Sequence, residues 1–181
     1  MIVTDTDIVS QGSLKSNRMI GMIQWMGIKS CLYTMKLLKE DVKYLIVHQS
    51  ATDRDQTTFE QIKKFHIWQG MGNIAYHYFI DGKGKTRRGR SESSVGTHTK
   101  ANNMAAKSLG VCLAGNFNTQ EPHQSQLISL ERILRDLAFR YKIGPDNILG
   151  HREVPGAATE CPGDSLNEWL VDFRNRIGKE K

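Results

Sequence analysis

Apolar, strand-like segments that alternate with helix-periodic segments constrain the fold of this chain most. Residues 42–47 read Val-Lys-Tyr-Leu-Ile-Val, a composition rich in β-branched and aromatic residues that is typical of a buried strand. Leucines at helical spacing over residues 123–141 indicate a long amphipathic helix. Because strands and helices alternate, we predict a single α/β domain with a central mixed β-sheet flanked by helices. The further predicted elements are strands at 74–80, 109–113 and 147–149, a hairpin turn at 81–82, and helices from Thr57 or Thr58 to Trp68 and over 166–177.

Length and composition exclude several classes of protein. A chain of 181 residues suits one domain, and 39% hydrophobic with 24% charged residues argues against disordered, collagen-like and coiled-coil chains. Its three cysteines are too few for a disulfide framework. The net charge of +6 favours an anionic partner, which could be a nucleic acid, an anionic lipid or a bacterial envelope. We find no run of 18 apolar residues, so we expect no transmembrane segment.

The first 40 residues differ in composition from the rest. They hold five of the seven methionines and none of the four prolines. The apolar run at 19–28 is a poor match to a signal peptide, because acidic residues precede it and no small-residue cleavage site follows. Its alternatives are an amphipathic arm that packs on the domain, or a working chain that starts near Met35. We therefore divide the chain into an N-terminal extension or arm, 1–40, and a domain, 41–181.

Two histidines and a cysteine have the positions expected of metal ligands. His48 ends the first apolar strand, and His151 follows the short strand at 147–149. Ligands bind at the carboxyl ends of strands in open α/β sheets. Cys161 lies ten residues after His151, and mixed imidazole and thiolate donors suit Zn²⁺. Spacing alone fits equally well with a buried structural cysteine and a hydrogen-bonding loop histidine.

Five segments in order resemble the zinc-dependent N-acetylmuramoyl-L-alanine amidases. That family includes phage endolysins, bacterial wall amidases and animal peptidoglycan recognition proteins. The resemblance covers about residues 42–175. The segments are Tyr-Leu-Ile-Val-His48-Gln-Ser-Ala-Thr, Ile-Ala-Tyr76-His77-Tyr-Phe-Ile-Asp-Gly-Lys-Gly, Val-Gly-Thr-His98, Ser-Leu-Gly-Val-Cys112-Leu-Ala-Gly-Asn-Phe, and Gly-His151-Arg-Glu-Val with Thr159-Glu-Cys161-Pro-Gly.

The resemblance implies roles for individual residues. It implies Zn²⁺ held by His48, His151 and Cys161, and cleavage of the amide between the lactyl group of N-acetylmuramic acid and L-alanine. Tyr76 matches a tyrosine that contacts the oxyanion, and a phenol can donate to developing negative charge. Thr159 stands where some members carry a lysine, so it offers a neutral donor. These two are the expected catalytic residues.

Three further residues take expectations from the same resemblance. His98 matches a groove histidine, so we expect it to bind the substrate or stabilise its loop. Cys112 stands where another branch has a glutamate base, which leaves no obvious carboxylate base. His77 follows Tyr76 directly and should point to the opposite face of the sheet, away from the metal. A basic cluster on the predicted hairpin is either a solvated strand edge or an attraction to an acidic wall: Lys83, Lys85, Arg87, Arg88 and Arg90.

The function that we predict is hydrolysis of peptidoglycan by a zinc amidase of the phage or prophage endolysin type. Such a protein is made in the host cytoplasm and reaches the cell wall after release. We expect bacterial peptidoglycan as its partner and a monomer as its state. The alternative is a peptidoglycan-binding recognition module that does not cleave, which Cys161 disfavours. No RNP, zinc-finger or helix-turn-helix signature supports a nucleic-acid partner.

Overall fold

The computed structural model describes residues 36, 37 and 39–180. The predictions for residues 1–35 therefore lie outside the described residues. Leu37 is buried at 3% exposure, and its backbone N–H donates to the Ser93 carbonyl at 2.9 Å, so the chain is already packed on the domain at this residue. None of the helices over the described ranges is long and apolar enough to cross a membrane.

A mixed sheet forms the centre of the described part of the chain. Its five strands lie in the order β3-β2-β4-β1-β5 within the described residues. The strand β4 is parallel to β1 and β2, β5 is parallel to β1, and β3 is antiparallel to β2. The predicted mixed sheet and hairpin are thereby confirmed. The strands are β1 (Tyr44–Gln49), β2 (Tyr78–Ile80), β3 (Thr86–Arg88), β4 (Ser108–Leu113) and β5 (Ile148–Gly150).

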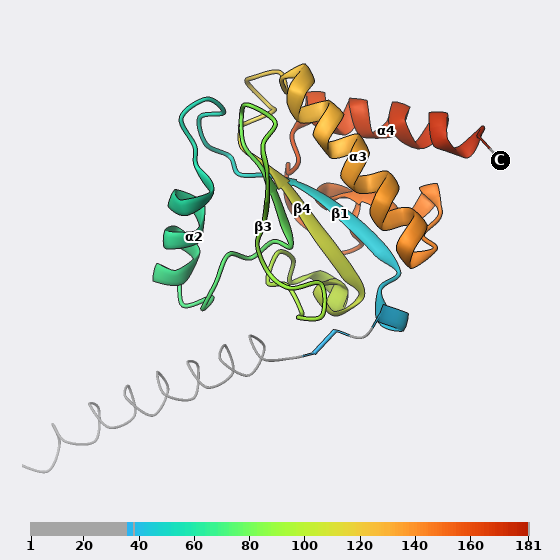
Figure 1. Cartoon of the computed structure of the whole chain (residues 1–181), viewed down its shortest axis with the longest axis horizontal. Coiled ribbons are helices and arrows are strands. Elements are labelled where there is room, and N and C mark those ends of the chain that lie inside the picture. The colour runs from blue at the N-terminus through green and yellow to red at the C-terminus, as the bar shows by residue number, and fades with distance from the viewer. Residues whose placement is uncertain (1–35, 38, 181) are drawn as a thin grey trace, which may run out of the picture.

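Helices cover both faces of this sheet (Figure 1). The helices α3 (Gln124–Tyr141) and α4 (Asp164–Gly178) lie together on one side, and α2 (Phe59–Trp68) lies apart from them on the other. The short 3-10 helices are η1 (Lys39–Asp41), η2 (Ala101–Lys107), η3 (Pro145–Asn147) and η4 (His151–Glu153).

Alternation along the strands builds a separate core on each face. Leu45 and Val47 of β1 pack in the larger core with residues of α3 and α4, whereas Ile46 packs with η2. Ile62 of α2 packs with Phe79 of β2. Because side chains alternate along a strand, His48 shares the face of Ile46, opposite the larger core.

Reciprocal hydrogen bonds define the start of α2, at one of the two threonines where the sequence predicts it. The Gln61 backbone N–H donates to Thr58 Oγ1 at 3.3 Å, and the Thr58 N–H donates to the Gln61 side chain at 2.8 Å. This reciprocal capping box satisfies two donors that a helix start leaves unpaired. Thr58 is therefore the N-cap, and α2 begins beside the first strand's polar loop.

The strand predicted at 74–80 is shorter in the structure. It comprises only Tyr78–Ile80. Upstream of it, the Ala75 N–H donates to His66 Nδ1 at 3.2 Å, and the Ala75 carbonyl accepts from the Thr97 N–H at 3.1 Å. These bonds tie Ala75, the residue before Tyr76, to α2 and to Thr97. Tyr76 consequently lies on a connecting segment immediately before β2.

Candidate functional site

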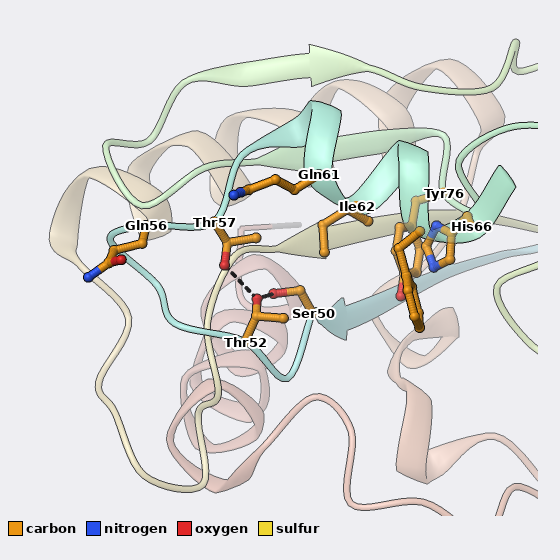
Figure 2. A pocket seen from close by; sticks show the side chains of 9 residues that line it. Ser50, Thr52, Gln56, Thr57, Gln61, Ile62, His66 and Tyr76 are labelled. Atoms are coloured by element: carbon orange, nitrogen blue, oxygen red, sulfur yellow. Dashed lines mark hydrogen bonds between the residues drawn. The ribbon is translucent and has the colours of Figure 1, made fainter. Parts of the chain in front are cut away.

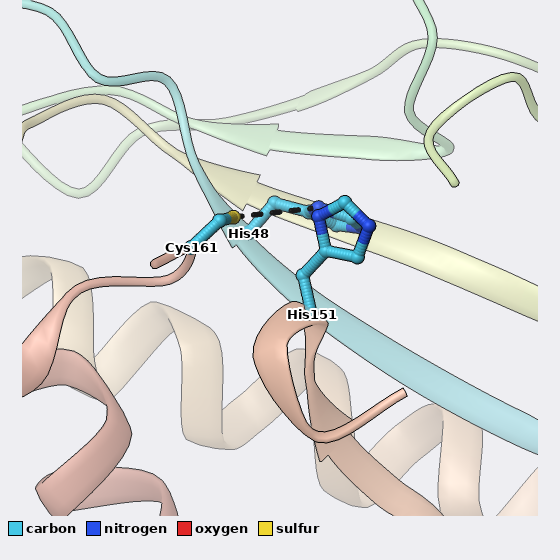
Figure 3. A group of neighbouring side chains, drawn as sticks. All are labelled: His48, His151 and Cys161. Carbon is cyan, nitrogen blue, oxygen red and sulfur yellow. Dashed lines mark hydrogen bonds between the residues drawn. The ribbon is translucent and has the colours of Figure 1, made fainter. Parts of the chain in front are cut away.

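Two histidines and a cysteine converge at the carboxyl end of β1. The donor atoms of His48, His151 and Cys161 all lie within 4.8 Å of one another. Figure 3 shows the two imidazoles and the thiol directed toward one another from three separate segments. Cys161 Sγ is 3.6 Å from His48 Nδ1. This is the arrangement expected of three ligands that share one cation.

The sheet register places the two histidines side by side. Val47 pairs with Gly150 between the parallel strands β1 and β5, so His48 and His151 each follow one member of that pair. The two rings are 4.6 Å apart between centroids. Adjacent parallel strands thus bring together residues that lie far apart in the sequence.

Two backbone hydrogen bonds hold Cys161 in place. The Gln49 N–H donates to Cys161 Sγ at 3.4 Å, and the Arg152 N–H donates to the Cys161 carbonyl at 2.6 Å. The loop before α4 is thereby fastened to the end of β1 and to η4. A thiolate gains from an N–H donor, because hydrogen bonding to a charged form favours it.

Burial keeps the candidate ligands electrically neutral when no cation is near. It lowers the pKa of His48 well below its usual value, and the neighbouring His98 and His151 lower it further. Burial also lowers the pKa of His151 and raises that of Cys161 to about 11. Neutral imidazoles have the free nitrogen lone pairs that metal binding requires.

The spacing between His48 Nδ1 and Cys161 Sγ suits Zn²⁺. Zinc–nitrogen and zinc–sulfur bonds of about 2.1 and 2.3 Å at a tetrahedral angle separate the two donors by about 3.6 Å. The distance between His48 Nδ1 and Cys161 Sγ is 3.6 Å. Two imidazoles and a thiol leave one tetrahedral position open, as in catalytic zinc sites. The residues therefore fit the metal.

Tyr76 lies beside this cluster. Its ring is 5.1 Å from that of His48 and 5.4 Å from that of His66, between centroids. Burial raises the pKa of Tyr76 well above its usual value, and Cys112 and Cys161 raise it further. The phenol therefore keeps its proton at neutral pH and can act as a hydrogen-bond donor.

A pocket of about 400 Å³ runs from Tyr76 along α2. In Figure 2, Tyr76 and His66 lie at one end and Gln56 at the other. Hydroxyl groups line its floor, where Thr57 donates to Thr52 at 2.8 Å. The apolar side chains of Ile62 and Phe65 lie beside these polar groups, so the lining is mixed. The lining residues are Ser50, Thr52, Gln56, Thr57, Gln61, Ile62, Phe65, His66 and Tyr76.

Residues 38–164 match the family of N-acetylmuramoyl-L-alanine amidases. The chain belongs to this amidase family.

Similar proteins from phages, animals and bacteria agree with that membership. The chain is 31% identical to the endolysin of Escherichia phage T7 over 137 residues, which cover 72% of the chain and 87% of that protein. It is 30% identical to peptidoglycan-recognition protein SC2 of Drosophila melanogaster over 164 residues, 86% of each. The solved amidase LysC from Clostridium intestinale superposes with a TM-score of 0.68 at 27% identity, covering 81% of the chain and 91% of LysC.

The other predicted site residues of this amidase take different positions around the cluster. Thr159 Oγ1 accepts from the Cys161 N–H at 3.2 Å, which leaves the hydroxyl proton free to donate. His98 is buried at 6% exposure, with Nδ1 at 3.0 Å from His48 Nε2. Neither arrangement tests the predicted oxyanion or substrate-binding role. Both stay predictions.

His77 is not one of the three convergent donors among the described residues, but it precedes β2, so alternation along a strand does not explain its position. Its Nε2 is 2.9 Å from the Ser94 carbonyl, and its Nδ1 accepts from the Gly110 N–H at 2.9 Å. His77 therefore joins the 94 loop to β4. Cys112 is fully buried in β4, and burial raises its pKa well above the usual value, so its thiol is no substitute for a carboxylate base.

Sequence reasoning missed several residues that support the site. Glu153 accepts from the Gly150 N–H at 2.6 Å and pairs with Arg174 of α4 at 2.7 Å, which fixes the turn that carries His151. His66 holds Ala75 beside Tyr76. The sequence around His151 does not predict the ion pair between Glu153 and Arg174, because Arg174 lies on α4. The hydrogen bond from the Gln49 backbone N–H to Cys161 Sγ likewise could not be predicted, because it depends on where the loop places Cys161.

Proposed function

We propose that this chain is a zinc-dependent amidase that cleaves peptidoglycan between the lactyl group of N-acetylmuramic acid and L-alanine. The observation that carries the proposal is the convergence of His48, His151 and Cys161 within 4.8 Å, in a chain of the amidase family. Tyr76 and a pocket lined by hydroxyl, amide and apolar groups adjoin that cluster. A metal centre, a proton donor and a groove together supply what amide hydrolysis needs.

In this proposal His48, His151 and Cys161 hold Zn²⁺. The bound zinc would supply Lewis acidity, which polarises an amide carbonyl and acidifies water. The thiolate of Cys161 cancels one of the two positive charges of zinc, so the centre is less electrophilic than an all-histidine one. The Gln49 N–H at 3.4 Å from Sγ stabilises that thiolate.

Hydrolysis forms a carbon–oxygen bond from water, breaks the carbon–nitrogen bond and leaves a proton on the departing amine of L-alanine. The Tyr76 phenol donates a hydrogen bond to the carbonyl oxygen as it gains negative charge. The Thr159 hydroxyl, oriented by the Cys161 N–H, adds a second neutral donor. Both groups stay protonated through the reaction and stabilise charge without transferring it.

The pocket along α2 takes the stem peptide in this proposal. Its hydroxyl and amide groups can bind the carbonyls and N–H groups of an extended peptide. The glycan then extends from the end of the pocket at Tyr76. This orientation places the first amide of the stem beside the metal ligands.

The similarity to phage endolysins supports a lytic role. We propose synthesis in the host cytoplasm, action on the wall after release, a monomeric state, and the division into an arm at 1–40 and an amidase domain at 41–181. The recognition-protein relatives support the alternative, binding without cleavage. The ligand set that includes Cys161 favours cleavage.

Zinc content and cleavage in matched cysteine variants test the proposal. Cys161→Ala should lose bound zinc, measured by elemental mass spectrometry, and should not solubilise purified sacculi. Cys112→Ala removes a buried thiol outside the cluster and should retain zinc. Equal zinc content in both variants would contradict the ligand set. A zinc-loaded wild type that binds sacculi without cutting them would establish the recognition-module function instead.

A further inference from the structure

His98 occupies a slot built from two glycines. A Cβ on Gly96 would lie 2.4 Å from His98 Cδ2, and one on Gly110 would lie 2.6 Å from His98 Cγ. Real Cβ atoms do not approach other atoms so closely, so glycine at both positions makes room for the ring. His77 fastens the two walls of the slot, because it bonds both Ser94 and Gly110.

The slot aims His98 at the second nitrogen of a candidate metal ligand. His48 faces Cys161 Sγ with its Nδ1 at 3.6 Å and faces His98 Nδ1 with its Nε2 at 3.0 Å. The two ring planes are inclined at 78°, an edge-on approach. His48 is 1% exposed and His98 is 6% exposed, so water has little access to this bond.

Metal binding at His48 Nδ1 determines the direction of the bond. A neutral imidazole that gives one nitrogen to a metal carries its proton on the other nitrogen. The proton must then lie on His48 Nε2, and His98 Nδ1 must accept it. Metal-ligating histidines characteristically donate in this way to an outer partner, which fixes the orientation of the ring.

We propose that His98 is a positioning residue that accepts a hydrogen bond from His48 Nε2 and so holds His48 Nδ1 toward Cys161 and His151. The proposal rests on the proposed metal centre. It gives His98 a role in assembling the centre that its burial favours over direct contact with substrate.

The proposal also fixes the tautomer of His98. If Nδ1 accepts, the proton of the neutral ring lies on Nε2, which is buried and has no hydrogen-bond partner among the described residues. Burial lowers the pKa of His98 well below its usual value, so the ring is neutral and carries one proton. The unpaired Nε2 of His98 lowers the stability of the fold, whereas the bond from His48 to Nδ1 orients the His48 ring.

Two nearly isosteric substitutions test the bond. In His98→Asn, the amide oxygen can take the place of Nδ1 as an acceptor; in His98→Leu, a similar volume offers no acceptor. Zinc affinity is measured by competition with a chromogenic chelator, and ligand geometry by the absorption spectrum of the Co²⁺-loaded protein. We expect His98→Leu to weaken zinc binding by about 10–100-fold, in line with the loss of outer-shell partners, and His98→Asn to restore most of it.

Thermal melting of the metal-free variants separates folding from binding. If His98→Leu does not fold, His98→Gln replaces it, since glutamine places its amide near the Nε2 position and should bind zinc more weakly than His98→Asn. Zinc affinity of His98→Leu equal to wild type would overturn the proposal. So would equal losses in the Leu and Asn variants.

Nitrogen-15 NMR of the histidine rings gives a direct readout without any substitution. In the zinc-loaded wild type, His98 should carry its proton on Nε2 and His48 should carry its proton on Nε2. A protonated His98 Nδ1 would overturn the proposal while leaving the metal centre intact. A wild type that binds no zinc would instead contradict the proposed function, and the positioning role with it.

Discussion

At the scale of residues, the two ring nitrogens of His48 have different partners. Nδ1 faces Cys161 and Nε2 faces His98. The grouping of His48, His151 and Cys161, which the structure brings within 4.8 Å, could be predicted because five segments together resemble the amidase family, whereas their spacing alone left it open. The contact with His98 could not, because it depends on the ring orientation and on the packing of two glycines.

Tyr76→Phe tests the proton donor. The variant removes one hydroxyl near the metal ligands and keeps the ring that packs against His48 and His66. Loss of one oxyanion donor costs about 3–4 kcal/mol, so kcat should fall by about 10²–10³-fold. Zinc content and KM should stay near wild type. Unchanged kcat on soluble muropeptides would assign Tyr76 a structural role.

At the scale of elements, helix periodicity predicted boundaries well. The helix predicted at 123–141 is α3, Gln124–Tyr141. The helix η2 was not predicted, because Asn102 and Asn103 adopt left-handed φ values of 47° and 55°. The Asn102 side chain donates to the Pro155 carbonyl at 2.7 Å, a tertiary contact that no local pattern contains.

Arg174→Met tests how α4 supports η4. Arg174 donates to both oxygens of Glu153 at 2.7 and 2.8 Å and to the Ile148 carbonyl at 2.9 Å. Because its loss leaves the half-buried Glu153 carboxylate without its charged partner and with the Gly150 N–H as donor, we expect about 2 kcal/mol of destabilisation. Zinc affinity should also fall, since Glu153 holds the turn of His151.

Arg176→Met is the matched control on the same helix. Arg176 makes an exposed pair with Glu131 at 3.0 Å, and such pairs contribute about 0–1 kcal/mol. Urea unfolding and chelator competition measure both variants. Equal destabilisation by the two substitutions, with zinc affinity unchanged in both, would remove the supporting role of Arg174.

At the scale of the whole molecule, the order of strand-like and helical segments predicted an α/β domain with a mixed sheet. The order of the strands within the sheet could be known only from the structure. A carboxylate joins distant parts of that fold. Glu92 accepts from Arg140 at 2.6 Å and from Tyr141 at 2.6 Å, both at the end of α3, and from Tyr78 of β2. No spacing rule connects these residues, so the network was absent from the sequence interpretation.

Glu92→Gln tests the contribution of this network to acid stability. Burial raises the pKa of Glu92, but the hydrogen bonds from Arg140, Tyr141 and Tyr78 outweigh it and lower the pKa from 4.5 to about 2. A lowered folded-state pKa stabilises the protein above the unfolded-state value, and this stabilisation is lost as pH falls from 4.5 toward 2. The shift corresponds to roughly 3 kcal/mol at neutral pH.

Urea unfolding between pH 7 and pH 2 measures that contribution. The wild type should lose more stability over this range than Glu92→Gln, and the two should converge near pH 2. Glu60→Gln, at an exposed pair with Arg87 at 3.4 Å, serves as the control and should follow wild type. Parallel curves for wild type and Glu92→Gln would show that the network contributes nothing to acid stability.

Mass spectrometry of purified sacculi incubated with the protein tests the central claim most directly. The account predicts new free amino termini on L-alanine, which disappear when a chelator removes the metal and return when Zn²⁺ is restored. Glycan cleavage or cleavage between peptide residues would contradict the proposed bond. Cleavage at L-alanine that persists in full after metal removal would contradict the role of the cluster formed by His48, His151 and Cys161.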